Sequence, residues 1–250
     1  MTYLFSVIFY EPILNLLIFL YKTIALQDFG LAIILLTLAI KLILWPLNQS
    51  AIKSQKELQD LQPKIDELKK KYATDKMALS QATMALYKDN KTNPFSSCLP
   101  LLIQLPVLIA VYSVFRNVAN NNLDKVYSFV GKPEFINTIS FGFLNLGKPN
   151  VYLAVLAGLA QFWQAKMMIV NKPAIKSPGS NDESMAAIMN KQMLYFMPLV
   201  TVFIGISLPG GLTLYWFVLT IFTALQQLYV LRKSNSSEKN NQALEGEIIK

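Results

Sequence analysis

Apolar residues lie in long blocks along the chain rather than in short periodic runs. An α-helix needs about 20 residues to cross a bilayer, with a range near 17–25. Five blocks approach or reach that length, at residues 30–47, 98–118, 151–165, 193–208 and 212–231. The pattern therefore predicts an all-α membrane protein with five transmembrane helices.

An earlier apolar stretch is interrupted by Glu11 and Pro12. Its second half, residues 13–26, carries Asn15 and Lys22. Polar groups at these positions favour an interfacial or re-entrant helix over a span. We therefore expect an N-terminal interfacial helix on the outer side of the membrane.

The segment between the first two spans has a different pattern. Apolar residues recur every three or four positions there, at Ile52, Leu58, Leu61, Ile65, Leu68 and Tyr72. This spacing predicts one apolar stripe on a helix over residues 52–72, which Pro63 is expected to kink. Residues 76–89 repeat the pattern more weakly with Met77, Met84, Leu86 and Tyr87. The short link at 73–75 predicts an antiparallel helical hairpin.

These elements divide the chain into an interfacial helix (1–28), a first span (29–48), a hairpin (49–97), a second span (98–118), an outer loop (119–150), a third span (151–170), an inner loop (171–191), two further spans (192–208 and 211–231) and a tail (232–250). Only Pro209, Gly210 and Gly211 separate the last two spans, so we expect these to pack as an antiparallel pair. The tail is rich in Ser, Asn and Lys and is predicted to be disordered.

Composition supports the membrane assignment, because 53% of residues are hydrophobic and only 15% are charged. Soluble domains carry roughly 25% charged residues. Of the 23 Lys and Arg residues, seventeen fall in the hairpin, the inner loop and the tail: Lys53, Lys56, Lys64, Lys69, Lys70, Lys71, Lys76, Lys88, Lys91, Lys166, Lys172, Lys176, Lys191, Arg232, Lys233, Lys239 and Lys250. Five lie on the opposite side: Lys22, Arg116, Lys125, Lys132 and Lys148.

Basic residues are enriched in cytoplasmic loops. The bias therefore predicts that the N-terminus lies outside and the hairpin and C-terminus lie in the cytoplasm. A sixth span at 13–26 would move the N-terminus inside and leave the rest unchanged.

The sequence offers little for covalent chemistry. A single cysteine, Cys98, excludes an internal disulfide framework, and the lack of histidine argues against a Cys/His zinc site and removes any Ser-His or Cys-His catalytic pair. No Gly-rich phosphate-binding loop is visible. We expect no enzymatic activity, no metal and no cofactor.

Lys41 is the sharpest single feature, because it lies inside the first apolar block. A lysine at the centre of a transmembrane helix costs about 2.5–3.5 kcal/mol. Its stem could lift the ammonium to the headgroups, or the side chain could face a water-filled cavity and meet a ligand. None of the five blocks contains an acidic partner, which favours the cavity.

Other polar residues lie at membrane depth, namely Thr37, Gln104, Gln161, Gln164 and Thr220. Taken singly, such residues form interhelical hydrogen bonds worth about 0.6 kcal/mol each. Together with Lys41 they indicate a polar groove.

Several strings in this order resemble the YidC family of membrane protein insertases, also called the Oxa and Alb group, from Pro12 to Leu231. The strings are GLAIILLT with the lysine and PL that follow, LQPKIDELKKKY, LYKDNKTNPFSSCLPLLIQLPVLIAVY, FLNLGKPNVYL, FWQAKM, and MP, LPGGLTLYW and QQ in the last two spans. The long string that enters the second span is the most specific.

The resemblance implies a five-helix core with a hydrophilic groove that is open to cytoplasm and lipid and closed outside. The basic groove residue of the family maps to Lys41, where most members carry arginine. Lysine keeps the charge and loses the planar five-donor fork. Gln164 and Trp216 map to the groove lining, and Gln104 joins them.

The implied function is a membrane protein insertase and chaperone of the bacterial cytoplasmic membrane. Its partners would be nascent membrane protein clients and the lipid bilayer, with the ribosome and the Sec translocon as candidates and no sequence-specific nucleic acid. The hairpin residues Leu61, Pro63 and Met84 are expected to help recruit clients. One alternative is a small-anion transporter or channel that uses Lys41, although the chain has no internal repeat of the kind common in transporters. A chaperone that folds clients without inserting them also stays open.

Overall fold

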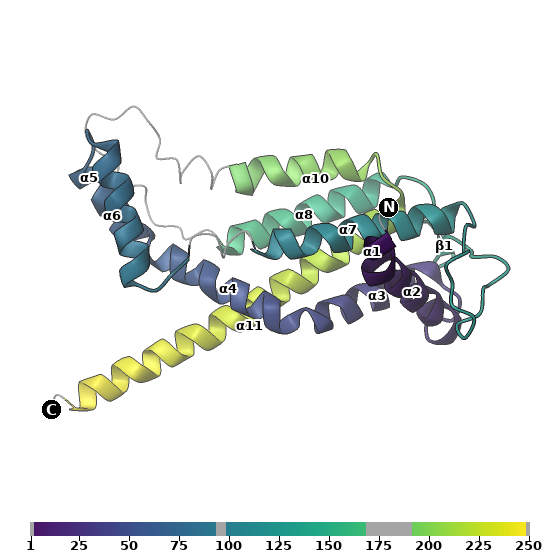
Figure 1. Ribbon diagram of the computed structural model, residues 1–250, viewed down its shortest axis with the longest axis horizontal. Coiled ribbons are helices and arrows are strands. Elements are labelled where there is room, and N and C mark those ends of the chain that lie inside the picture. The colour runs from purple at the N-terminus through teal and green to yellow at the C-terminus, as the bar shows by residue number, and fades with distance from the viewer. Residues whose placement is uncertain (1–2, 94–98, 169–191, 249–250) are drawn as a thin grey trace.

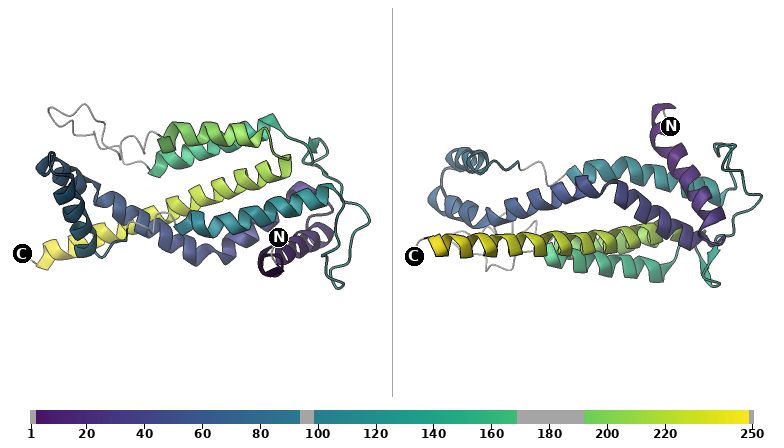
Figure 2. Two further views of the ribbon diagram at one scale, coloured as in Figure 1. Left: turned by 45° about the horizontal axis from the view of Figure 1, so that its top comes forward. Right: turned by 90° about the horizontal axis from the view of Figure 1, so that it is seen from below.

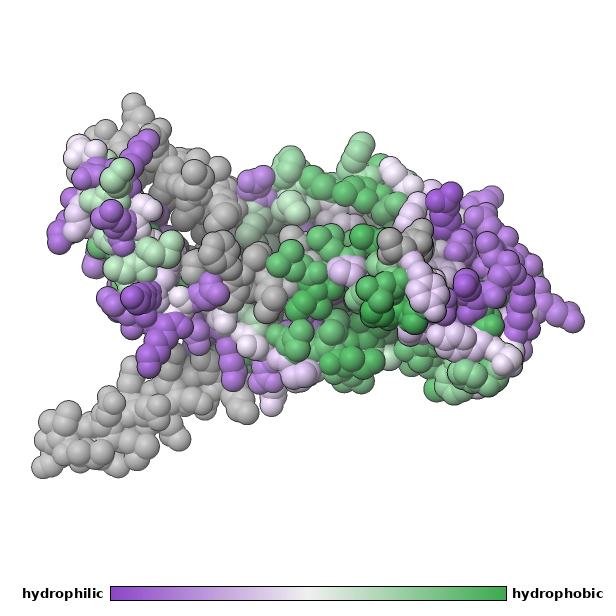
Figure 3. Space-filling view, viewed as in Figure 1, coloured by the Kyte–Doolittle hydropathy of each residue, from purple (hydrophilic) through white to green (hydrophobic). Residues whose placement is uncertain are grey.

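A bundle of helices runs along the long axis of the molecule (Figure 1). The structure, a computed structural model, describes residues 3–93, 99–168 and 192–248. The described helices of this bundle are α3 (Phe29–Ile43), α7 (Leu99–Ala119), α8 (Val151–Met168), α10 (Met197–Gly205) and α11 (Gly210–Ile248). Hydrophobic side chains cover the middle of this bundle, and hydrophilic ones gather at both ends (Figure 3). This is the surface that an all-α membrane protein presents, and the predicted class is confirmed.

Three described helical stretches are long and apolar enough to cross a membrane, at Tyr3–Thr23, Leu102–Ala119 and Gly210–Arg232. A fourth forms if the bent pair Phe29–Ile43 and Trp45–Lys71 is taken as one span, and Gln192–Gly205 is a shorter apolar helix. The count of five spans stays a prediction.

The two ends of the bundle differ. We call the end that carries residues 119–150 the loop end, and the end that carries α4 (Trp45–Asp60), α5 (Gln62–Lys71) and α6 (Lys76–Asp89) the hairpin end. In Figure 1, α5 and α6 stand across the long axis.

The first span was expected to continue to Leu47, but α3 ends at Ile43. The chain turns by 68° between α3 and α4. Leu44 adopts φ −86° and ψ 2°, and Pro46 follows in the first turn of α4. Proline has no N–H, and its ring clashes with the carbonyl four residues earlier, so the helix breaks in front of it. The helix expected over residues 52–72 is interrupted in the same way: it breaks at Leu61, and Pro63 lies in the first turn of α5 that follows.

The N-terminal apolar stretch is helical throughout rather than interrupted at Glu11 and Pro12. It consists of α1 (Tyr3–Phe5), a π-helical turn η1 (Ser6–Tyr10) and α2 (Glu11–Thr23). The Glu11 N–H bonds to the Ser6 carbonyl, and this wider turn accommodates Pro12. In the right view of Figure 2, the N-terminal helix crosses the direction of the bundle steeply.

The last two long helices do not form the predicted antiparallel pair. Instead α10 and α11 each pack mainly against α8 and touch each other little. Small residues explain this arrangement, because a Cβ on Gly158 would lie 2.4 Å from the Val202 side chain and one on Gly205 would lie 2.9 Å from Ala154. Their absence lets α10 approach α8 closely. A second π-helical turn, η3 (Gln192–Phe196), precedes α10.

The tail was predicted to be disordered, but α11 continues as one helix to Ile248. A helix that already exists extends without a new nucleation step, which explains how a polar sequence of low apolar content can follow an apolar helix in the same conformation. Residues 249–250 lie outside the described residues.

At the loop end, residues 119–150 include two short antiparallel strands, β1 (Ile139–Ser140) and β2 (Leu144–Asn145). The main hydrophobic core extends into this loop through Leu123, Val130, Ile136 and Leu146. Among the described residues, that core contains no buried residue of α4, α5 or α6.

Candidate functional site

Lys41 lies in the last turn of α3 and points into the bundle. Its side chain is only 4% exposed, and it is the one charged residue among the buried side chains of the described residues. It makes no hydrogen bond or ion pair with any of them. Thr37, one turn earlier on the same face, is completely buried, and its hydroxyl donates to the Ile33 carbonyl at 2.6 Å.

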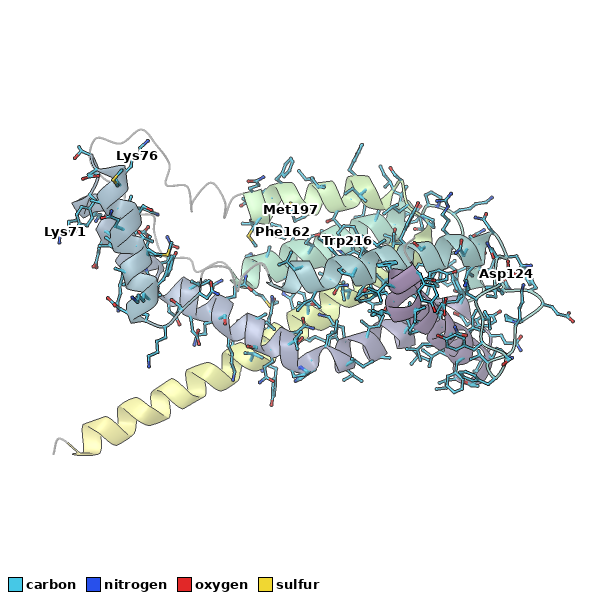
Figure 4. The ribbon with its side chains drawn as sticks, viewed as in Figure 1. Lys71, Lys76, Asp124, Phe162, Met197 and Trp216 are labelled. Carbon is cyan, nitrogen blue, oxygen red and sulfur yellow. The ribbon has the colours of Figure 1, made fainter. Side chains whose placement is uncertain are left out.

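Gln104 and Tyr215 join α7 to α11. The Gln104 amide donates to the Tyr215 hydroxyl at 2.7 Å. Tyr215 is completely buried, whereas Gln104 is half-buried. The neighbour of Tyr215, Trp216, is also half-buried, and Figure 4 labels it midway along the bundle. One turn further along α11, the Thr220 hydroxyl donates to the Trp216 carbonyl at 2.9 Å.

Gln161 and Gln164 lie on α8 and behave differently from each other. Gln161 accepts a hydrogen bond from the Thr201 hydroxyl of α10, so it joins α8 to α10. Gln164, one turn further along, is half-buried. Both side chains are half-buried, and they differ in that Gln161 is bonded to a neighbouring helix.

Two contacts fix the relative heights of these groups along α3 and α11. Near the start of both helices, a Cβ on Gly211 would lie 3.1 Å from Ile33. Further along, the Gln226 amide donates to the Trp45 carbonyl at 3.3 Å. The two helices therefore run in the same direction. Thr37 and Lys41 lie between the two contacts on α3, and Trp216 and Thr220 lie between them on α11.

The result is a set of polar groups at the middle height of an apolar bundle. Thr37 and Thr220 have each donated their single proton to a helix carbonyl, so their oxygens can only accept further bonds. Lys41 contributes a positive charge and three donors, none of which has a partner among the described residues. Such a set can bind water, carboxylates or the polar groups of a peptide, and it has no nucleophile–base pair. The described residues also contain no cluster of three or more His, Cys, Asp or Glu that could hold a metal.

The hairpin residues expected to recruit clients differ in their exposure. Leu61 is buried at the junction of α4 and α5, and Pro63 beside it is half-buried. Met84 is 58% exposed on α6, where Met77 is exposed too. In this conformation Met84 can meet a partner, and Leu61 cannot.

Four polar or aromatic residues escaped the sequence reasoning, namely Trp45, Thr201, Tyr215 and Gln226. Tyr215 precedes Trp216, and Gln226 belongs to the QQ string that had been noted without a role. Thr201 and Trp45 gave no signal, because a threonine or tryptophan in an apolar block is ordinary.

A helical bundle with an apolar girdle, polar ends and a buried lysine that has no partner in the described part of the chain is typical of an integral membrane protein. The sequence profile of the family described as 60Kd inner membrane protein matches residues 19–238. The chain therefore belongs to the YidC family of membrane protein insertases.

Three relatives, each called membrane protein insertase YidC, illustrate the similarity. The Fusobacterium nucleatum protein is 34% identical over 208 residues, which cover 82% of this chain and 87% of the relative. The Oceanobacillus iheyensis protein is 35% identical, with 82% of this chain and 75% of the relative covered. A Listeria monocytogenes protein, numbered YidC 1, is 36% identical over 81% of this chain and 64% of its own length. The comparisons give no support to the small-anion transporter.

Proposed function

We propose that this protein inserts nascent membrane proteins into the lipid bilayer. The observation that carries the proposal is Lys41, a buried cation without an acidic partner among the described residues. The names of the relatives point the same way. No enzymatic step, cofactor or metal forms part of this proposal.

The physical task of an insertase is to carry the polar part of a client across hydrocarbon. An isolated charge at the bilayer centre costs at least about 2.5–3.5 kcal/mol. Polar groups at the middle height of the bundle replace part of the lost hydration, and Lys41 attracts acidic residues in the translocated tail of the client. The apolar part of the client then leaves sideways into lipid.

We assign the client groove to Lys41, Thr37, Gln104, Gln164 and Trp216, with Gln161 bracing α8 against α10. A lysine binds a carboxylate as a point charge, without the two-pronged geometry of arginine. The groove should therefore favour acidic clients by charge more than by shape.

We also propose a bacterial cytoplasmic membrane location, with the N-terminus outside and the hairpin inside, on the strength of the seventeen-to-five distribution of basic residues. Clients would arrive from the ribosome, alone or with the Sec translocon. Met84 on the exposed face of α6 is where the hairpin would first meet them.

Reconstitution tests the function directly. Purified protein in liposomes should make a single-span client with an acidic translocated tail resistant to external protease. Lys41→Leu should slow this insertion by about tenfold or more, which corresponds to about 1.4 kcal/mol, and Lys41→Arg should restore it. Lys166→Leu, which removes an exposed lysine of α8, is the matched control and should leave the rate unchanged. Normal insertion by Lys41→Leu would remove Lys41 from the mechanism.

A further inference from the structure

Trp45, the first residue of α4, is held by one face of α11. Its ring meets Phe222 edge-on at 5.9 Å between centroids and lies 6.3 Å from Tyr229. Its carbonyl accepts the Gln226 amide at 3.3 Å. Positions 222, 226 and 229 are four and three apart, so these three side chains share one side of α11. We call this contact the Trp45 latch.

Two hydrogen-bond acceptors of α11 have nothing to accept, one in the latch at Gln226 and one on the adjacent residue, Gln227. The amide oxygens of Gln226 and Gln227 are buried without a partner among the described residues. The two side chains are 1% and 5% exposed. Exchanging the amide oxygen and nitrogen of Gln226 would not help, because its oxygen would then face the Trp45 carbonyl. A buried acceptor without a donor loses its hydration and gains nothing in return.

The latch also lies next to the turn from which α4 and the hairpin extend, so a small change there moves both. The 68° turn between α3 and α4 is one residue before it, at Leu44. Beyond the turn, the buried residues of α4 and α5 are Ala51, Ile52, Leu61 and Ile65, and none of them belongs to the main core. If Trp45 leaves α11, little else in the core holds α4 and the hairpin in place.

We propose that the Trp45 latch opens, and that opening uncovers Gln226 and Gln227 as a binding site for polypeptide segments with free backbone N–H groups. The closed latch leaves two acceptors unpaired, so the open form is favoured by any ligand that supplies donors. An entering client segment that has not yet formed its own helix presents such donors in a row. The site lies at the hairpin end, beyond Lys41 along α3 and α11, and it receives the client backbone before Lys41 receives an acidic side chain. This inference rests on the proposed function.

Spin labels on α4 and α11 measure the opening. Lys53→Cys and Leu225→Cys, both at exposed positions, would be labelled in a Cys98→Ser protein in nanodiscs. Their distance distribution would be recorded with and without a synthetic single-span client peptide. The wild-type latch should give a short distance alone and a longer one that grows with the peptide. Trp45→Ala should give the longer distance in both samples.

Gln227→Met removes one of the two acceptors at nearly constant volume and leaves the hydrogen bond from Gln226 to the Trp45 carbonyl in place. With peptide added, this variant should reach the longer distance in a smaller population than wild type, and its client insertion should slow severalfold. A distance distribution and an insertion rate equal to wild type would overturn the site. If the wild-type protein shows the longer distance in the same population with and without peptide, water is a sufficient donor. That result would overturn the specificity for peptide.

The same samples separate this inference from the proposed function. If wild-type protein inserts clients while its distance never changes, the latch is wrong and the function stands. If the distance responds as expected while no client is inserted, the function is wrong and the latch stands.

Discussion

The loop end and the hairpin end of the molecule satisfy their polar groups in different ways. At the loop end, the Asn15 amide is buried and donates to the Lys125 carbonyl, and its oxygen accepts from the Tyr127 N–H. Lys22 donates to the carbonyls of Val130 and Gly131 at 2.8 and 3.1 Å. Segments more than a hundred residues apart in sequence are thereby joined by direct hydrogen bonds.

In α5 and α6, at the hairpin end, most polar side chains are exposed or half-buried. No residue of α6 is buried. The contacts there are local, such as the Asp66–Lys69 ion pair at 3.0 Å and Lys71 over the ring of Tyr72. Figure 4 shows Lys71 and Lys76 at this extremity and Asp124 at the other.

The difference indicates which end of the bundle resists opening. A loop whose donors and acceptors are paired inside the protein must break several bonds to open, whereas a hairpin held by few buried contacts can move at low cost. We therefore expect client segments to enter the bundle at the hairpin end.

The largest effect expected from this comparison is all-or-none, and it concerns sidedness. Single cysteines replacing Lys70 and Lys132 in a Cys98→Ser protein should react with a membrane-impermeant maleimide from opposite sides of intact cells. Lys132→Cys should label at once, and Lys70→Cys only after permeabilisation, because basic loops stay in the cytoplasm. Labelling of both from outside would contradict the orientation.

The next largest effect is on stability. Asn15→Leu should lower the free energy of unfolding by about 2–4 kcal/mol, because it leaves the Tyr127 N–H and the Lys125 carbonyl without partners. The matched control at the other end is Asn90→Leu, since Asn90 makes one exposed bond to the Leu86 carbonyl. It should cost less than about 0.5 kcal/mol. Equal losses, measured by denaturant unfolding in nanodiscs, would show that the two ends do not differ.

A smaller loss is expected where α3 meets the loop. The Gly30 N–H donates to the Ser140 hydroxyl at 2.5 Å, and a Cβ on Gly30 would lie 2.9 Å from the Ser140 Cβ. Gly30→Ala should destabilise the protein by about 1–3 kcal/mol through overpacking. Adding Ser140→Gly removes two of the three closest atoms but also the acceptor of the Gly30 N–H, so it should recover only part of the loss in thermal midpoint. No recovery would mean that the cost has another source.

The smallest effects are expected within the hairpin. Leu61→Ala removes a buried side chain from the α4–α5 junction and should raise hydrogen exchange of the α5 and α6 amides by about tenfold without moving the global thermal midpoint. Met84→Ala, at an exposed position, should change the free energy of unfolding by less than about 0.5 kcal/mol. It should therefore leave both the exchange rates and the thermal midpoint nearly unchanged. A lower global midpoint for Leu61→Ala would show that the hairpin unfolds together with the bundle.

The sequence anticipated what depends on local pattern. Long apolar blocks indicated the helices, and Met77 to Tyr87 indicated a second hairpin helix, which the structure has as α6. The lysine in the first apolar block is buried in the bundle, and the groove inferred from it stays a prediction.

Long-range geometry could not be inferred in this way. A three-residue turn at Pro209 implied that the last two helices pack together, but Gly158 and Gly205 let α8 take that place. The partners of Asn15 lie over a hundred residues away, and nothing in its own neighbourhood identifies them. The unpaired oxygens of Gln226 and Gln227 appear only once α4 covers α11.

The bonds between Asn15 and the loop have a consequence for how this chain is itself made. Tyr127 follows Asn15 by 112 positions. At a synthesis rate of about 5–20 residues per second, the amide waits roughly 6 to 22 s for that partner. With the N-terminus outside, as proposed, the loop must also cross the membrane before the two can meet. During that interval α2 can already pack against α3, but the Asn15 amide has no loop partner. The hydrogen bonds that close the loop end are therefore among the last parts of the fold to form. A newly made copy therefore passes through the same half-assembled condition as the proteins it is proposed to serve.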